Sequence, residues 1–184
     1  MKKYIKYSGF SFLIGFVCLV LLPNSVEAQN TTSSQPAIEN PDFDKVVNRY
    51  LNYKVDTISV RTLKNLKGSF LLLDAREKEE YNVSHLEGAL YLGYDDPDYS
   101  VLQDVNLDTE LIVYCSIGAR SEKMGKKLKK MGFTKVKNVY GSIFEWANQG
   151  YPLVDVNNAS TNIVHGYNKR WSRWVTNSDY EITY

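Results

Sequence analysis

The chain has 184 residues and a formal net charge of +1, with 22 basic and 21 acidic side chains. A nearly neutral chain offers no electrostatic argument for binding nucleic acid or an anionic membrane surface. Its two histidines lie far apart, and the chain has neither the ligand spacing of a zinc site nor a phosphate-binding glycine motif. The sequence therefore predicts no metal and no cofactor.

Residues 1–28 have the pattern of a secretory signal peptide. Three lysines precede an apolar run over 10–22, and Val26-Glu27-Ala28 offers a small-residue cleavage site. The run is shorter than the roughly 20 residues that a spanning helix needs. We expect cleavage to leave an exported chain without a stable membrane span, located in the periplasm or cell envelope of a bacterium, or secreted. An uncleaved anchor is the alternative.

Cleavage would remove three lysines, one glutamate and Cys18, which leaves a formal charge of −1 and Cys115 as the only cysteine. A chain with one cysteine forms no internal disulfide. Cys115 is then buried and inert, paired with another chain, or reactive.

Residues 29–42 are polar, contain Pro36 and Pro41, and indicate a linker. Helix and strand signals alternate from there on. The segments are 43–52 (helix), 58–66 (a strand edge, then a helical turn), 69–76 (strand), 78–86 (helix, then turn), 88–94 (strand), 110–115 (strand), 120–133 (helix), 135–141 (strand) and 142–150 (helix). Such alternation predicts an α/β domain with a central, mostly parallel sheet flanked by helices. In this class the ligand site lies at the carboxyl ends of the strands, where Cys115 follows the apolar run 110–114.

The segment 120–133 predicts an amphipathic helix. Met124, Leu128 and Met131 share one of its faces, and the lysines lie largely opposite. We interpret the lysines as the solvated face of the helix and not as a binding patch.

The segment Cys115-Ser-Ile-Gly-Ala-Arg120 lies between a strand end and a helix start. A tight turn there directs backbone N–H groups into one concave space, beside the unpaired N–H groups of the helix N-terminus. Gly118 has free choice of backbone angles, and Arg120 adds a fixed positive charge. Such an anion cradle lowers the pKa of a thiol at its floor, and no neighbouring histidine is needed as a base. The alternative is that Cys115 ends its strand as a small hydrophobic residue.

The loop also resembles the active-site loop of the rhodanese (sulfurtransferase) family, whose pattern is Cys-x-x-Gly-x-Arg. "LLLDARE" with Glu80-Tyr81 resembles the family's Asp-x-Arg-x-x-x-Glu-Tyr segment, "SHLEGA" its Gly-His-Ile-x-Gly-Ala turn, and "VKNVYGSIFEWANQGYPLV" its closing strand and helix. The order and spacing hold from about residue 57 to 155. Ser84 and Ser142 stand where the family usually has glycine.

The resemblance implies a three-layer, single-domain exported member of this family over residues 43–155. It also implies that Cys115 carries a sulfane sulfur as a persulfide, taken from thiosulfate, a polysulfide or a similar anion. The acceptor would be a thiol, cyanide in the test tube, or a partner protein. The donor-binding positions would be Ser116, Ile117, Gly118, Ala119 and Arg120.

Two other functions are weighed against sulfur transfer. The cell-cycle dual-specificity phosphatases share the fold but have five residues between cysteine and arginine, against four here, which favours sulfur chemistry. A non-catalytic rhodanese-like module for binding, or for sensing sulfur or redox state in the cell envelope, is the main alternative.

Four residues are expected to support the site. Asp74 is predicted to tie neighbouring loops together, with direct catalysis as the alternative, because a carboxylate at the end of a buried strand needs hydrogen bonds. Arg76 is expected to pair with a carboxylate such as Glu80, with a place at the rim of the anion site as the alternative. His85 is expected to stabilise its turn and not to act as a base.

Residues 156–184 extend past the resemblance and are rich in aromatic side chains. Tyr167, Trp171, Trp174 and Val175 would share one face of a helix. We expect an accessory helix packed on the domain. A lid beside the cysteine loop, with His165, Lys169 or Arg170 tuning the anion site, is the sharper hypothesis, and a partner-docking helix is the third.

Overall fold

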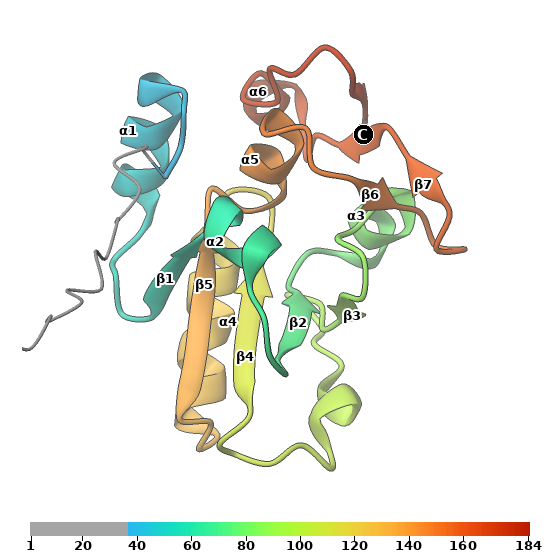
Figure 1. Ribbon diagram of the computed structural model, residues 1–184. Helices are drawn as coiled ribbons and strands as arrows, with labels where there is room; N and C mark the ends of the chain where they lie inside the picture. Colours follow the sequence, from blue (N-terminus) through green and yellow to red (C-terminus); the bar gives the residue numbers. More distant parts are fainter. Residues whose placement is uncertain (1–36) are drawn as a thin grey trace, which may run out of the picture. The chain divides into compact units, whose positions relative to one another are not determined.

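The structure is a computed structural model that describes residues 37–184, all within one compact unit. Its centre is a five-stranded sheet in the order β1-β5-β4-β2-β3, in which every pairing is parallel (Figure 1). The strands are β1 (Asp56–Ser59), β2 (Leu71–Asp74), β3 (Leu90–Tyr91), β4 (Glu110–Tyr114) and β5 (Lys135–Tyr140). The predicted α/β class with a parallel sheet is confirmed.

Helices cover both faces of the sheet, with α4 behind it and α2 in front of it in the view of Figure 1. The helices are α1 (Pro41–Tyr50), α2 (Val60–Asn65), α3 (Lys78–Val83), α4 (Ala119–Lys130) and α5 (Ser142–Asn148), with a 3₁₀ turn η1 (Tyr99–Leu102). No element was predicted where η1 lies. This arrangement makes the three layers that the resemblance implied.

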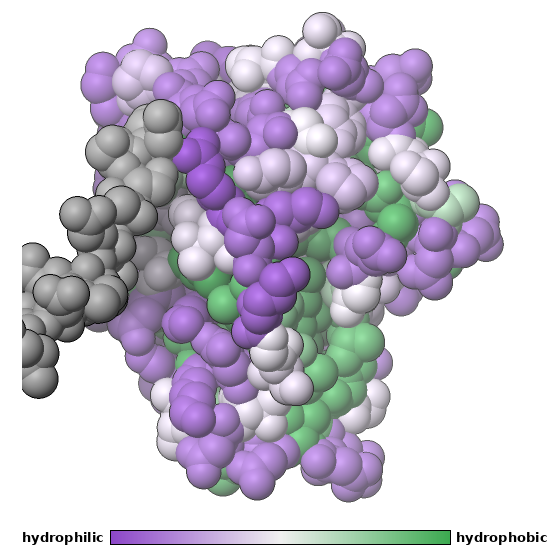
Figure 2. All heavy atoms as spheres, viewed as in Figure 1, coloured by the Kyte–Doolittle hydropathy of each residue, from purple (hydrophilic) through white to green (hydrophobic). Residues whose placement is uncertain are grey.

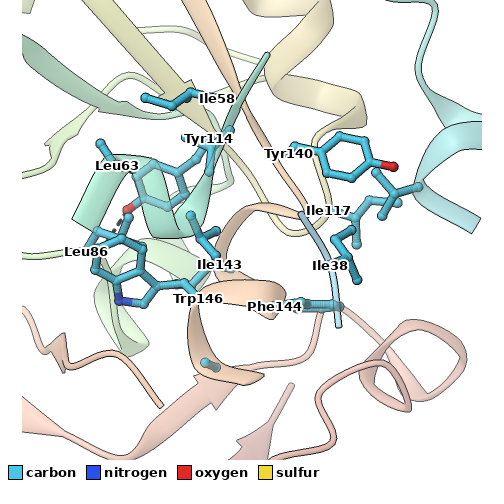
Figure 3. Close-up of a cluster of buried hydrophobic side chains, with 14 of the residues drawn as sticks. Ile38, Ile58, Leu63, Leu86, Tyr114, Ile117, Tyr140, Ile143, Phe144 and Trp146 are labelled. Carbon is cyan, nitrogen blue, oxygen red and sulfur yellow. Dashed lines mark hydrogen bonds between the residues drawn. The ribbon is translucent and has the colours of Figure 1, made fainter. Parts of the chain in front are cut away.

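Each central strand is apolar without alternation because both of its faces are buried. In β4, Leu111 and Val113 pack in a cluster with Met124 and Leu128 of α4. The intervening residues of β4 belong to a second cluster, which α1, α2 and α5 complete. Figure 3 shows part of that cluster, including Tyr114, whose hydroxyl accepts a hydrogen bond from the Leu86 N–H at 3.1 Å.

Helix α1 begins at Pro41, inside the segment predicted as a linker over 29–42. The Asn40 side chain accepts hydrogen bonds from the N–H groups of Asp42 and Phe43, and proline occupies the first helical position. Ile38 is already buried. The ordered fold therefore starts several residues before the predicted boundary at 43. Residues 1–36, with the predicted signal peptide and most of the predicted linker, lie outside the described residues.

The C-terminal extension is not the helix that its aromatic spacing predicted. It contains a single helical turn, α6 (Lys169–Ser172), and short strands. The strands in and before it are β6 (Leu153–Val154), β7 (Ser160–Thr161), β8 (Ile163–His165) and β9 (Glu181–Thr183). Strand β8 pairs in parallel with β9. The backbone groups used in this pairing cannot form helical hydrogen bonds, so a continuous helix through the extension is excluded. Figure 1 places this part, in red, beyond the carboxyl ends of the sheet strands.

The extension packs against α1 and α5. The Trp174 ring stacks on Phe43 with centroids 5.6 Å apart, and Trp171 meets Tyr50 edge to face at 5.0 Å. The Asn148 side chain donates to the Trp174 carbonyl at 2.8 Å. The extension is thus joined to the domain by aromatic contacts and by hydrogen bonds.

The face shown in Figure 2 is mostly hydrophilic, with hydrophobic residues visible over β2 and β4. Across residues 37–184, no helix is long and apolar enough to cross a membrane. In the same residues, no three metal-ligating side chains lie close enough together to hold an ion.

The amphipathic reading of α4 holds for its centre and fails at its end. Leu128 is completely buried, whereas Met131, just past the helix, is 46% exposed.

We expect Leu128→Ala to lower the free energy of unfolding by about 2–5 kcal/mol, because it leaves a cavity against the sheet. Met131→Ala is the control and should change it by no more than about 0.5 kcal/mol. Urea unfolding measures both, and equal losses would contradict this packing.

Candidate active site

Cys115 directly follows the last residue of β4, at the carboxyl edge of the sheet, and its side chain is buried with 1% exposure. Its backbone N–H donates to the Ser142 Oγ at 3.1 Å, and its carbonyl accepts from the Ile143 N–H at 3.2 Å. The start of α5 therefore holds the main chain of the cysteine from one side.

The loop after Cys115 turns through Gly118, whose φ of +114° belongs to the left-handed region that favours glycine. Its N–H lies 3.2 Å from the Cys115 Sγ and donates to it. Gly118 is also the N-cap of α4 and provides no side-chain cap, so first-turn N–H groups of α4 stay available to the loop. The floor of the loop is thus a cradle of N–H donors around the sulfur.

A second donor to the sulfur is Ser121, which the sequence reasoning did not single out. Its Oγ lies 3.4 Å from the Cys115 Sγ and 2.7 Å from the Asn138 Oδ1. Asn138 is oriented by its Nδ2, which donates to the Gly118 carbonyl at 3.0 Å. Because Ser121 has one hydroxyl proton, it can donate to only one of these two acceptors at a time. The sequence signal for this network was Asn138 itself, because a polar side chain in the otherwise apolar run "NVY" of a strand needs a hydrogen-bond partner.

Charge and hydrogen bonding decide the ionisation of Cys115. Burial raises the pKa of the thiol, but the Arg120 charge and the donors on Ser121 and Gly118 outweigh it, so the net pKa is lowered. A lowered thiol pKa means more thiolate, the nucleophilic form, at neutral pH.

Arg120 is held by a carboxylate on α3. Its Nη1 donates to the Glu80 Oε2 at 2.5 Å, and its Nη2 donates to the Glu80 Oε1 and to the Ser116 Oγ, both at 2.8 Å. Glu77 lies 3.8 Å from the same guanidinium. This pairing joins the end of the cysteine loop to α3 and so closes the loop.

Arg76 pairs with a carboxylate, as expected, but this carboxylate is Asp74 and not Glu80, which was given as the example. The Arg76 guanidinium bonds Asp74 with Nε and Nη2, at 2.9 and 2.7 Å, and Nη2 also donates to the Ser84 carbonyl at 2.6 Å. Glu80 binds Arg120 and not Arg76. Asp74 and Arg76 are both fully buried, and they join the end of β2 to the turn after α3.

His85 lies in that turn and away from the sulfur cradle. Its Nδ1 is 3.0 Å from the Tyr81 carbonyl, its ring stacks on Tyr81, and its backbone pairs with Val154. Burial lowers the pKa of His85. These contacts are those of a residue that stabilises its turn.

The two serines that replace family glycines behave differently. Ser142 has a φ of +52°, so it adopts the conformation that glycine would take, and its hydroxyl bonds the Cys115 N–H. Ser84 has an extended backbone with φ of −167°. The Ser84 Oγ is buried without a hydrogen-bond partner among the described residues.

Cys115 opens into a cavity of about 170 Å³. The lining residues are Tyr50, Cys115, Ser116, Ile117, Ala119, Arg120, Tyr167 and Trp171. A larger hollow of about 540 Å³ beside α2 and α5 contains no cysteine, and we therefore place the site in the smaller cavity. The extension thus reaches the cysteine loop as the lid hypothesis required. Lys169 and Arg170 do not line this cavity.

Comparison with known proteins shows the family of this domain. Residues 59–149 match the family model "Rhodanese-like domain". The chain is 37% identical over 102 residues to a probable molybdopterin-synthase adenylyltransferase of Porphyra purpurea, covering 53% of this chain and 26% of that protein. It is 32% identical over 81 residues to the putative sulfur carrier protein YrkF of Bacillus subtilis, covering 44% of this chain and 43% of that one.

Among solved structures, a rhodanese-like domain from Anabaena is similar with a TM-score of 0.48 and 22% identity, covering 54% of this chain and 76% of that one. The fold and the cysteine loop define a rhodanese-like domain. Through residues 59–149 the chain belongs to the rhodanese-like domain family. It spans less than half of either curated relative.

The lowered pKa predicts how the reactivity of Cys115 depends on pH. The rate of alkylation by iodoacetamide should rise with a midpoint below about 8.5, the ordinary thiol value. Ser121→Ala should move the midpoint upward, because it removes a donor to the thiolate. Ser178→Ala, at an exposed position, is the control and should not. Identical midpoints in wild type and Ser121→Ala would show that the hydroxyl plays no part.

The Glu80–Arg120 pair predicts an acid-sensitive contribution to stability. Burial raises the pKa of Glu80, but Arg120 outweighs it and the net pKa is lowered. A lowered carboxyl pKa stabilises the fold above the unfolded value of about 4.3, and this contribution is lost as the pH falls through the folded value.

We expect Glu80→Gln to lower the free energy of unfolding by about 3 kcal/mol at pH 7, since it leaves the Arg120 charge without its main partner. The loss should shrink toward pH 3. Glu79→Gln, exposed on the same helix, is the matched control. Urea unfolding at several pH values measures both, and a loss independent of pH would refute the electrostatic origin.

Proposed function

We propose that this protein is a sulfurtransferase that carries a sulfane sulfur on Cys115. The Cys115 thiolate attacks the outer sulfur of an anionic donor such as thiosulfate or a polysulfide. An S–S bond forms to Cys115 while the S–S bond of thiosulfate breaks and its electron pair leaves with sulfite. The persulfide then gives its outer sulfur to a nucleophilic acceptor, and the thiolate is regenerated.

The observation that carries this proposal is the environment of one sulfur atom. Cys115 is buried, yet its pKa is lowered, by Arg120 and by donors on Gly118 and Ser121. An inert strand-terminal cysteine in an apolar setting would have a raised pKa. Donors aimed at the sulfur also stabilise the terminal charge of a persulfide, which lies one bond further into the loop.

The other residues divide into two groups. The N–H groups of the segment from Ser116 to Arg120 would bind the donor and the departing anion. Glu80 keeps Arg120 on the loop, and Asp74 with Arg76 keeps the neighbouring loop in place. All of these except Cys115 position or bind, and none of them exchanges a proton in the scheme above.

The acceptor is proposed to be a thiol, a small molecule such as cyanide in the test tube, or a partner protein. The similarity to a putative sulfur carrier protein supports an acceptor of the protein class. Export to the periplasm or cell envelope is a further proposal that rests only on the pattern of residues 1–28.

Incubation with thiosulfate in the absence of any acceptor tests the proposal. We expect the intact mass of the wild type to increase by one sulfur atom, and cyanide to discharge this sulfur as thiocyanate. Cys115→Ser should show neither, because no thiolate is present. A folded wild type that gains no sulfur from thiosulfate or polysulfide would contradict sulfur transfer and favour a binding or sensing module.

A further inference from the structure

We infer that the sulfur donor of this protein carries an apolar, preferably aromatic group, and that Tyr50, Tyr167 and Trp171 select it. This inference rests on the proposed function and names the substrate class of the same cavity. These three residues form the aromatic wall of the cavity. The chemistry fits an organic thiosulfonate better than a bare inorganic dianion.

The aromatic wall lies outside the segment that matches the family model. The floor of the cavity, from Cys115 to Arg120, falls within residues 59–149. Tyr50 comes from α1, before that segment, while Tyr167 and Trp171 come from the C-terminal extension. The features that decide what reaches the sulfur are therefore supplied by this chain's own additions to the domain.

The wall is held in place. The Trp171 ring meets Tyr50 edge to face at 5.0 Å. The turn before α6 is fixed because the Gly166 N–H donates to the Thr183 carbonyl at 2.8 Å. The Ser172 hydroxyl is bonded to that of the last residue, Tyr184, at 2.7 Å. Residues 183 and 184 thus support the segment that carries Trp171.

Tyr167 adopts a backbone conformation that is costly for its residue type. Its φ is +63°, in the left-handed region that side chains other than glycine and asparagine rarely occupy. In that conformation its ring lies 4.9 Å from the Arg120 guanidinium, and its N–H donates to the His165 Nδ1 at 3.1 Å. A strained residue facing a reactive site points to a role for that residue at the site.

The charge around the cavity argues against a small dianion as the preferred donor. Arg120 is the one cationic residue that lines the described cavity, and Glu80 already pairs with it through both carboxylate oxygens. Glu77 adds a second negative charge at 3.8 Å, and Tyr167 covers the guanidinium. A dianion would enter beside a cation that is already neutralised.

The space and the lining favour an organic group instead. A cavity of about 170 Å³ is similar in size to apolar cavities that hold a benzene ring. Aromatic rings gain most when they enclose another apolar or flat group. Tyr50 and Tyr167 are 43% and 47% exposed, so they have surface left to cover such a group.

The transfer balances for an organic thiosulfonate, R–SO₂–S⁻. The Cys115 thiolate attacks the terminal sulfur, and a new S–S bond joins that sulfur to Cys115. The bond between the terminal sulfur and the sulfonyl sulfur breaks, and its electron pair leaves with the sulfinate R–SO₂⁻. The two negative charges on the reactants become one on the persulfide and one on the sulfinate.

Three donors test the inference: benzenethiosulfonate, methanethiosulfonate and thiosulfate, with thiocyanate formation from cyanide as the readout. The quantity of interest is the ratio of kcat/KM for the phenyl over the methyl donor. Dividing the wild-type ratio by that of Trp171→Ala cancels the difference in intrinsic reactivity. We expect the phenyl preference to fall roughly tenfold or more in Trp171→Ala, as for other apolar pockets that lose contact area.

Lys169→Ala is the matched control, because Lys169 is exposed on the same helical turn and lies outside the cavity lining. It should keep the wild-type ratio. A measurement on the wild type alone covers the case in which Trp171→Ala does not fold. Benzenesulfinate should slow the alkylation of Cys115 by iodoacetamide at concentrations at which methanesulfinate does not.

The outcomes separate the inference from the proposed function. If thiocyanate forms from all three donors with the same phenyl preference in wild type and Trp171→Ala, the aromatic wall has no selective role and sulfur transfer stands. Equal protection by the two sulfinates would also overturn the inference. If no donor gives thiocyanate with the folded wild type, sulfur transfer itself fails.

Discussion

The buried pair between Glu80 and Arg120 is the interaction on which the site depends. It joins α3 to the first turn of α4, and Ser116 bonds both members of the pair, so the cysteine loop is tied to α3. The same pair sets the electrostatics. Arg120 is near enough to lower the pKa of Cys115, and Glu80 accepts hydrogen bonds from both terminal nitrogens of Arg120. Cys115 is therefore activated without leaving a free cation in the cavity.

Because Glu80 neutralises Arg120, the remaining lining of the cavity contributes to the choice of ligand. Backbone donors and Ser121 provide polar contact at the sulfur, while the wider part of the cavity is bounded by aromatic rings. The reacting centre and the entrance thus have different chemistry. Two residues at the site have a positive φ, Ser142, which bonds the Cys115 N–H, and Tyr167, whose ring faces Arg120. Each places a side chain that contacts the loop or its arginine, and the remaining packing compensates for their strain.

Much of the fold followed from local sequence patterns. The apolar run "LIVY" predicts a strand buried on both faces, and β4 is such a strand. The reason is that a parallel sheet covered by helices leaves no polar face. The spacing of Met124 and Leu128 predicts the buried side of α4 because both contacts lie within one helix. The position of Cys115 at the strand end, with Gly118 and Arg120 after it, indicated the cradle. In each case the signal and the structure it predicts lie within a dozen residues.

The sequence by itself thus determined the α/β class, the order of the main elements of the domain and the position of Cys115 at a strand end, since these depend on short-range periodicity. Only the tertiary structure decided which carboxylate each arginine binds. Glu80 was an example of a partner expected for Arg76, but in the fold Glu80 binds Arg120 and Arg76 binds Asp74. The extension is the second case. Its aromatic spacing suited a helix, but pairing between β8 and β9 outweighed that local preference and brought Trp171 to the cavity. Partners far apart in the chain carry no local signal, so the three-dimensional fold alone selects them.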